Sequence, residues 1–268
     1  MVVAHPWRAG GTGALVTGTA YMECAGATAF GCAKELPVPT NTPTPINHLY
    51  FLLDRSGSMA SIADDVVGGF NTFLAEQAAD VDDARVTLVQ FDSGDPFEVV
   101  VDAKRIARVP ELTTDTYVPR GSTPLLDATG GIIEHAARRQ AKRAKAAKPA
   151  EEITVVTITD GFENASRAFT RDRIRQMIAA KETDGWTFVF LSADLDGYAD
   201  AGALGYDQRS VQSWETTGES FAMTMSSVSR AVSDKRRHDR QGARYDKGDF
   251  FRGVKEAEAA RGVADIED

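Results

Sequence analysis

Short apolar runs alternate with longer segments of helical periodicity from Ile46 onward, and this alternation restricts the fold more than any other feature of the sequence. A short, continuous apolar run is typical of a buried strand, whereas apolar residues that recur every three or four positions are typical of a helix. Strands that alternate with helices form βαβ units, in which parallel strands are covered by the helices that connect them. The sequence therefore predicts an α/β domain built on a mostly parallel sheet.

The expected strands are residues 48–53, 86–91, 97–101, 153–159, 186–191 and 211–214. Helices are expected after Ser61, which with Asp64 resembles a capping box, and after Thr123, read as the N-cap before Pro124. Further helices are expected over residues 170–182, 198–204 and 219–232. Residues 93–96 are too few to hold a crossover helix, so the second and third strands should form an antiparallel hairpin.

The two ends of the chain differ in composition from this regular part. Residues 1–45 are rich in Gly, Ala and Thr and then in Pro, which predicts a disordered segment followed by an extended linker. Residues 234–268 mix both charges with few apolar side chains and are predicted to be a loosely ordered tail. The folded domain is therefore expected to span residues 46–233.

Composition excludes several classes of protein. A net charge of −9 does not suit specific nucleic-acid binding, which needs excess Lys and Arg against the phosphates. No apolar run is long enough to span a bilayer, and the N-terminus lacks the pattern of a signal peptide. Both cysteines, Cys24 and Cys32, lie in the N-terminal segment, so no disulfide framework holds the core. We expect a cytoplasmic protein.

Oxygen side chains follow two of the expected strands and a later loop. Asp54, Ser56 and Ser58 come directly after the first strand, Thr123 lies in a Gly-Ser-Thr-Pro loop, and Asp160 follows residues 153–159. If the strands before Asp54 and Asp160 are neighbours, their ends lie about 5 Å apart. Carboxylates and hydroxyls are hard ligands, so the set predicts a Mg²⁺ site, with Mn²⁺ or Ca²⁺ as alternatives.

These residues resemble the metal-ion-dependent adhesion site of the von Willebrand factor A (VWA) family, over residues 48–232. In that family an Asp-x-Ser-x-Ser motif, a Thr from a later loop and the Asp of a Thr-Asp-Gly turn hold the metal; here these would be Asp54, Ser56, Ser58, Thr123 and Asp160. The resemblance implies a doubly wound, Rossmann-like three-layer αβα sandwich whose mostly parallel sheet has one antiparallel edge strand. The residues around the two Asp motifs resemble those of bacterial cytoplasmic members of the family more than those of animal matrix members.

Coordination chemistry suggests what such a site does. Mg²⁺ takes an octahedral shell of oxygens at about 2.1 Å and gives up its waters reluctantly. Neutral hydroxyls leave the ion with net positive character, so an Asp or Glu of a partner protein could replace a water. We therefore expect a metal-dependent protein-binding module and not an enzyme.

Two other functions remain open. Phosphohydrolases of the haloacid dehalogenase type also place an Asp after the first strand, but they need a second Asp two positions later, where this chain has Ser56. A Gly-x-Ser-x-Gly elbow, a P-loop and a Gly-x-Gly-x-x-Gly motif are all missing from the sequence. The chain could also serve as the adaptor subunit of an ATPase or chelatase assembly.

Three further segments are weaker candidates for a functional role. Asp92 follows the second strand and either orients the metal shell or forms a turn. Asp194, Asp196 and Gly197 echo a calcium loop, but helix capping is the simpler interpretation. The basic segment 138–145 complements a helix C-terminus, or else offers a docking patch to an acidic partner or RNA.

Overall fold

The structure is a computed structural model that describes residues 45–80, 84–193, 197–214, 217–243, 245–246, 248 and 250–252, without the side chains of 197–200. Both cysteines and nearly all of the predicted N-terminal segment lie outside the described residues. The acidic positions Asp194 and Asp196, and residues 253–268 of the predicted tail, also lie outside them.

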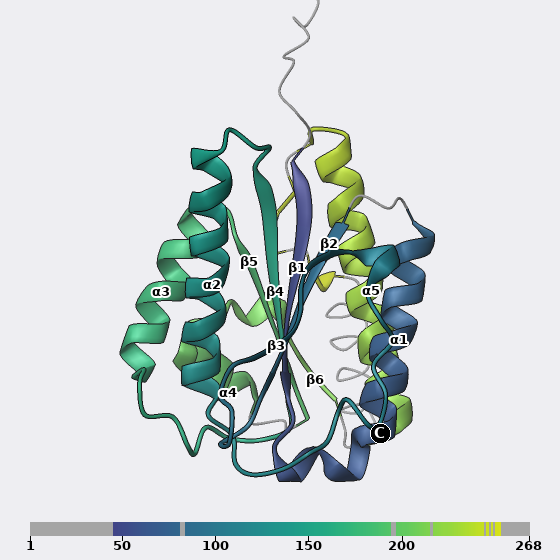
Figure 1. The fold of residues 1–268 in the computed structure, drawn as a ribbon, viewed down its shortest axis with the longest axis vertical. Helices are drawn as coiled ribbons and strands as arrows, with labels where there is room; N and C mark the ends of the chain where they lie inside the picture. The colour runs from purple at the N-terminus through teal and green to yellow at the C-terminus, as the bar shows by residue number, and fades with distance from the viewer. Residues whose placement is uncertain are drawn as a thin grey trace, which may run out of the picture. The chain divides into compact units, whose positions relative to one another are not determined.

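One six-stranded sheet forms the centre of the domain, in the order β3-β2-β1-β4-β5-β6 (Figure 1). Only the pair of β2 with β3 is antiparallel, and every other pair of neighbours is parallel. The predicted hairpin and the predicted doubly wound sheet with one antiparallel edge strand are therefore confirmed. The strands are β1 (Ile46–Asp54), β2 (Ala84–Phe91), β3 (Glu98–Arg105), β4 (Glu151–Thr159), β5 (Thr187–Ser192) and β6 (Val211–Ser213).

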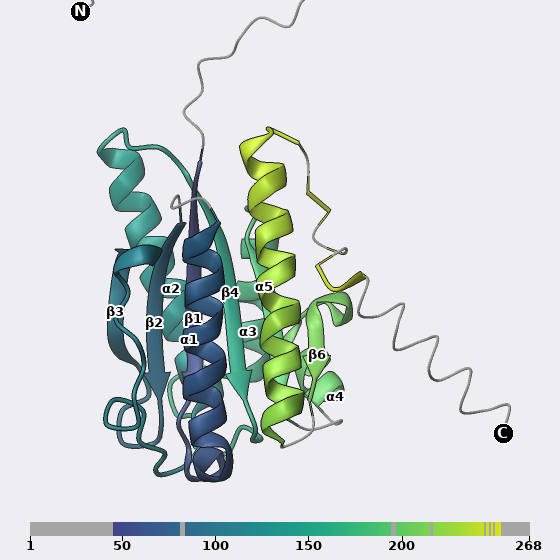
Figure 2. The ribbon, with the colours of Figure 1, turned by 90° about the vertical axis from the view of Figure 1, so that its right-hand side faces the viewer.

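Helices cover both faces of the sheet and give the αβα sandwich. On one face α1 (Ala63–Ala79) lies beside α5 (Gly218–Arg240), as Figure 2 shows. The other face carries α2 (Leu125–Lys145), α3 (Arg171–Thr183) and α4 (Gly197–Leu204). Short 3₁₀ helices cover Gly57–Ile62, Ile106–Arg108 and Gln208–Ser210.

Side chains of β1 alternate between two hydrophobic cores, because successive residues of a strand point to opposite faces. Leu49, Phe51 and Leu53 lie in the core under α1 and α5, whereas Tyr50 and Leu52 lie in the core under α2, α3 and α4. Burial on both faces explains why this strand reads as a continuous apolar run.

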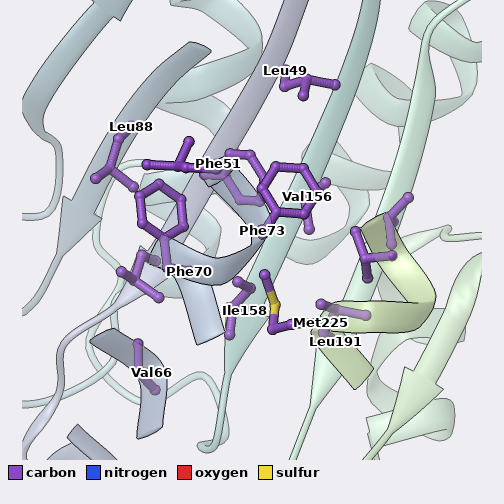
Figure 3. Packing of buried hydrophobic residues seen from close by; sticks show 14 of the residues in the cluster. Leu49, Phe51, Val66, Phe70, Phe73, Leu88, Val156, Ile158, Leu191 and Met225 are labelled. Carbon is purple, nitrogen blue, oxygen red and sulfur yellow. The ribbon is translucent and has the colours of Figure 1, made fainter. Parts of the chain in front are cut away.

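Aromatic contacts fix α1 against the sheet (Figure 3). The Phe51 ring meets the rings of Phe70 and Phe73 edge to face, with centroids 5.2 and 5.0 Å apart. Met225 of α5 belongs to the same core. The Asp-x-Ser-x-Ser segment lies between β1 and α1 and is joined to α1 by a 3₁₀ helix, so this packing holds the structure on both sides of the segment.

The predicted end of the last helix and the predicted cap of the first helix are wrong. The last helix ends at Arg240 and not at residue 232, because its charged residues find buried partners. Arg236 donates from Nη1 to the main-chain oxygen of Gln77 at 3.0 Å and to its Oε1 at 2.8 Å. The capping box at Ser61 is absent, since α1 begins at Ala63, after a 3₁₀ helix, without a side-chain cap. The predicted domain limits themselves stay predictions.

Two arginines at the basic end of α2 form ion pairs inside the protein. Arg139 Nη2 lies 3.0 Å and Arg143 Nε 3.3 Å from Oε1 of Glu151, whose side chain is fully buried at the start of β4. These two arginines thus join the end of α2 to the sheet. Lys142 and Lys145 are exposed.

None of the helices in the described ranges has the length and apolar character needed to cross a membrane.

Gly69 should be irreplaceable at the contact between α1 and α5. A Cβ there would lie 2.7 Å from the ring of Phe221, which is fully buried, whereas a Cβ at Gly68 would meet nothing within 4 Å. We expect Gly69→Ala to lower the free energy of unfolding by about 1–3 kcal/mol through overpacking. The matched control Gly68→Ala should raise it by up to about 1 kcal/mol through helix propensity. Denaturant unfolding measures both, and equal effects would contradict the predicted packing.

Candidate metal centre

The candidate site lies where β1 and β4 end side by side. The two strands pair in parallel, with Leu53 opposite Ile158, so Asp54 and Asp160 reach the same edge of the sheet. The strands before Asp54 and Asp160 are thus neighbours, which could only be assumed from the sequence. Ligand sites of open α/β sheets commonly lie at this carboxyl edge.

Asp54 is the most deeply buried member of the site, with no exposed surface. Its Oδ1 accepts the main-chain N–H of Ser56 at 2.7 Å, and its Oδ2 accepts the hydroxyl of Thr159 at 2.6 Å. Burial raises the pKa of Asp54 to about 6, against these hydrogen bonds, which favour the charged form. The negative charge of Asp160 makes a smaller contribution to this rise. A positive charge at this point would therefore be strongly favoured.

A short chain of hydrogen bonds joins the two serines to Asp160. Ser56 Oγ lies 3.1 Å from Ser58 Oγ, and the Ser58 hydroxyl donates to Asp160 Oδ1 at 2.8 Å. Burial also raises the pKa of Asp160, and the Ser58 bond only partly offsets this effect. Four of the five predicted oxygen side chains are therefore gathered at one point.

Thr123 completes the set, although its predicted role as N-cap is wrong. Pro124 occupies the N-cap position of α2, and no side chain caps it. Thr123 instead pairs with Asn164 through its main chain: its N–H donates to Asn164 Oδ1 at 2.9 Å, and its oxygen accepts the Asn164 N–H at 3.1 Å. The Thr123 hydroxyl makes no hydrogen bond with any described residue.

A small space faces the hydroxyls beside Gly161. A Cβ added at this glycine would lie 3.2 Å from Thr123 Oγ1 and 3.6 Å from Ser58 Oγ. Both hydroxyls therefore border the space next to Gly161, and a side chain in place of this glycine would occupy that space. The absence of a Cβ keeps the approach to the two oxygens open.

Main-chain contacts hold the Thr123 loop against the Asp-x-Ser-x-Ser segment. Gly57 N–H donates to the oxygen of Gly121 at 3.0 Å, and Arg120 N–H donates to the oxygen of Arg55 at 2.7 Å. Gly121 has φ +68°, a conformation that favours glycine. The Tyr117 hydroxyl donates to the main-chain oxygen of Asp54 at 2.6 Å.

Asp92 joins three loops of the site, which sequence reasoning only partly anticipated. Its buried Oδ2 lies 2.5 Å from Arg55 Nε and 3.0 Å from Arg120 Nε, while its Oδ1 accepts the N–H groups of Gly94 and Asp95 at 2.6 and 3.0 Å. Burial alone would raise the pKa of Asp92, but its bonds to Arg55 and Arg120 outweigh burial and lower it. Asp92 thus forms the turn and also positions the site, without touching the five oxygen ligands.

Sequence reasoning missed Glu163 and Asp127, which fasten the loop after β4 to the start of α2. Glu163 Oε2 accepts the N–H of Leu126 at 2.9 Å, and the Asp127 carboxylate accepts three N–H groups of residues 167–169 at 2.8–2.9 Å. Asp127 lies in the first turn of α2, where acidic residues are common, so nothing in the sequence distinguished it.

The oxygens present fit a hard divalent cation. Two carboxylates and three hydroxyls suit Mg²⁺, Mn²⁺ or Ca²⁺ better than a metal that prefers imidazole or thiolate. In the described ranges no three His, Cys, Asp or Glu side chains are grouped as metal ligands, and three of these five side chains are hydroxyls, which such a grouping does not count. The residues that could hold the ion are Asp54, Ser56, Ser58, Thr123 and Asp160.

Asp54 should destabilise the metal-free protein near neutral pH. Its folded-state pKa of about 6 exceeds the ordinary 3.8, so stability is greatest when Asp54 is protonated and falls as the pH rises from about 4 through about 6. In EDTA at pH 7.5 we expect Asp54→Asn to unfold with a free energy about 1–3 kcal/mol higher than wild type, and the two to converge at about pH 4. Urea unfolding measures this difference.

The exposed Asp115 gives a matched control, because Asp115→Asn should change stability by less than about 0.5 kcal/mol at either pH. A less stable Asp54→Asn protein at pH 7.5 would contradict the burial argument.

No protein-family model matches the sequence, and no curated protein matches it. Solved structures do share the fold. The pilus adhesin SpaC of Lactobacillus rhamnosus GG, in its open conformation, is 12% identical with a TM-score of 0.54, over 72% of this chain and 30% of the adhesin. Proximal thread matrix protein 1 of the mussel byssus is 14% identical with a TM-score of 0.51, over 71% of this chain and 47% of that protein.

A protein titled von Willebrand factor type A, from Catenulispora acidiphila, is 13% identical with a TM-score of 0.48, over 70% of this chain and 43% of that protein. This chain thus spans less than half the length of each of the three proteins. At identities this low the likeness concerns the fold alone, and the chain shares the αβα sandwich of the SpaC and byssus proteins.

Proposed function

We propose that this chain is a metal-dependent protein-binding module, and not an enzyme, that holds an acidic side chain of a partner through a Mg²⁺-type ion at the carboxyl edge of the sheet. The observation that carries this proposal is the convergence of five hard oxygen side chains on one point. Asp54, Ser56, Ser58 and Asp160 are joined there by short contacts, and the free hydroxyl of Thr123 borders the same space.

The charge balance of these ligands favours an acidic partner. Only Asp54 and Asp160 are charged, and the raised pKa of each shows how poorly the site tolerates negative charge without a cation. A bound divalent ion would act as a Lewis acid that accepts one more oxygen. The chain's own hydroxyls add no charge, so a carboxylate from the partner completes the shell with the strongest electrostatic gain.

The order of the motifs supports a VWA-type module. The Asp-x-Ser-x-Ser segment, the Thr loop and the Thr-Asp-Gly turn follow one another as they do in that family, on the fold that the family uses. One protein that shares this fold is a pilus adhesin. We extend the proposal to a bacterial, cytoplasmic module with an intact metal-ion-dependent adhesion site.

Exposed apolar side chains next to the site favour a protein as the partner. Phe162, two residues after Asp160, is 49% exposed, and Val118, which follows the Tyr117 that bonds to Asp54, is 52% exposed. Large apolar side chains exposed beside polar groups are common in protein interfaces. A carboxylate on the metal and apolar contacts around it would together give the affinity.

The phosphohydrolase alternative has less support. A haloacid dehalogenase needs a general acid two positions after its nucleophile, and Ser56 at that position is engaged with Ser58 and cannot supply a carboxylic proton. A role as adaptor subunit of an ATPase or chelatase assembly is compatible with the binding proposal, because it concerns only the identity of the partner.

Partner binding should depend on both the cation and Asp54. Immobilised wild type should retain a specific partner from a lysate of its source cells in Mg²⁺ and lose about 10-fold or more of it in EDTA, because the carboxylate then has no ion to bind. Asp54→Asn should retain the partner in neither condition, and Mg²⁺ should raise the melting temperature of wild type but not that of Asp54→Asn.

Asp115→Asn is the control and should behave as wild type throughout. The proposed function would be contradicted if wild type in Mg²⁺, wild type in EDTA and Asp54→Asn all retained the partner equally.

Catalytic turnover should be absent. With Mg²⁺ and p-nitrophenyl phosphate, wild type should release phosphate no faster than Asp54→Asn, because the site holds no general acid two positions after Asp54. Hydrolysis by wild type that disappears in Asp54→Asn would instead favour the phosphohydrolase. A colorimetric phosphate assay distinguishes these outcomes.

A further inference from the structure

A groove of about 660 Å³ runs along the carboxyl edge of the sheet beside the candidate metal centre. The loops after β2 and β4, the loop before α2 and the first turn of α2 line it. The lining residues include Ser93, Ser122, Asp127, Asn164, Ser166 and Arg167. Ser122 and Pro124 of this lining flank Thr123, and Asn164 is bonded to Thr123 through both main-chain groups. The groove therefore adjoins the proposed metal site at Thr123.

Most hydrogen-bond acceptors of the groove are engaged within the chain. The Asp127 carboxylate accepts three main-chain N–H groups, and Ser166 Oγ accepts the N–H of Asp127 at 3.0 Å. Ser93 Oγ accepts the N–H of Ser122 at 3.0 Å, and Asn164 Oδ1 accepts that of Thr123 at 2.9 Å. The lining thus offers few acceptors to a ligand.

The open donors of the groove include two nitrogen groups. The exposed guanidinium of Arg167 forms no hydrogen bond or ion pair with any described residue, and the same holds for Nδ2 of Asn164. Both groups donate and cannot accept. A groove with free donors and engaged acceptors is complementary to an anion, and Arg binds carboxylates through two parallel N–H groups.

We propose that this groove binds an extended segment of the partner that carries two acidic side chains, one for the metal and a second for Arg167. The inference rests on the proposed function, since it places the first carboxylate on the ion. Arg167 then selects among acidic partners, because a segment with one carboxylate meets the metal but leaves the guanidinium unpaired.

A random peptide library displayed on phage tests the proposal without a known partner. Selection on wild type in Mg²⁺ should enrich segments with two acidic positions. Arg167→Glu should keep the first acidic position and replace the second by Lys or Arg, because the groove then presents the opposite charge. Arg173→Glu, an exposed arginine of α3 that does not line the groove, is the matched control and should select the wild-type pool.

Synthetic peptides from the wild-type pool give the energetic test. Arg167→Ala should lower the affinity for the two-acid peptide by about 3- to 10-fold. It should not lower the affinity for the same peptide once the second acidic residue of the peptide is replaced by Ala. Thermal unfolding checks that each variant is folded.

The outcomes separate this inference from the proposed function. Identical pools on wild type and Arg167→Glu, with enrichment that needs Mg²⁺, would overturn the role of the groove and leave metal-dependent binding intact. Acidic pairs that depend on Arg167 but are selected equally in EDTA would support the groove and overturn the metal-dependent function. No acidic enrichment on wild type in either condition would overturn both.

Discussion

Parallel pairing of β1 with β4 is the constraint on which the candidate site depends. This pairing brings Asp54 and Thr159 together at the ends of neighbouring strands, where the Thr159 hydroxyl donates to Asp54 at 2.6 Å. Buried on both faces, the two strands cannot slip in register without moving their apolar side chains out of both cores. The position of the Asp54 carboxylate is therefore determined by the packing of the whole sheet, and the loops only have to bring Thr123 and Ser58 to it.

The loops are fixed to one another by groups other than the candidate ligands. Arg55 and Arg120 converge on Asp92, Gly57 bonds to Gly121, and Thr123 uses its main chain to pair with Asn164. Because these contacts use no hydroxyl of Ser58 or Thr123, the oxygens stay available for a cation. Binding sites whose ligands are positioned in advance lose less conformational entropy on binding. Removing Arg55 would leave the buried Asp92 carboxylate with the exposed Arg120 as its ion partner. Loss of part of a buried ion pair destabilises the fold, which links the stability of the fold to the geometry of the site.

Local signals made the strands and the five oxygen residues predictable, because apolar runs and strand-end motifs are contiguous in sequence. The errors have a different origin. The last helix was predicted to end at residue 232 because charged residues follow. Arg236 is nevertheless buried, and it donates hydrogen bonds to Gln77, more than a hundred positions away in the sequence. Thr123 looked like an N-cap because Pro124 follows it. The N–H groups of α2 are instead satisfied by Glu163 and Ser166 from the loop after β4. Such long-range pairings leave no local pattern in the sequence.

Overall charge opposes the binding of an acidic partner, which makes the local arrangement of charges decisive. The chain carries a net charge of −9, so an acidic segment is repelled at distances comparable with the Debye length of about 8 Å at physiological salt. Attraction must come from groups close to the contact, where screening is weak. Arg120 and Arg167 are exposed at this edge of the sheet, and a divalent ion between Asp54 and Asp160 would cancel the negative charge of these two carboxylates. If the proposed binding holds, repulsion from the rest of the surface would disfavour acidic segments that do not reach the ion, and the net charge would contribute to specificity.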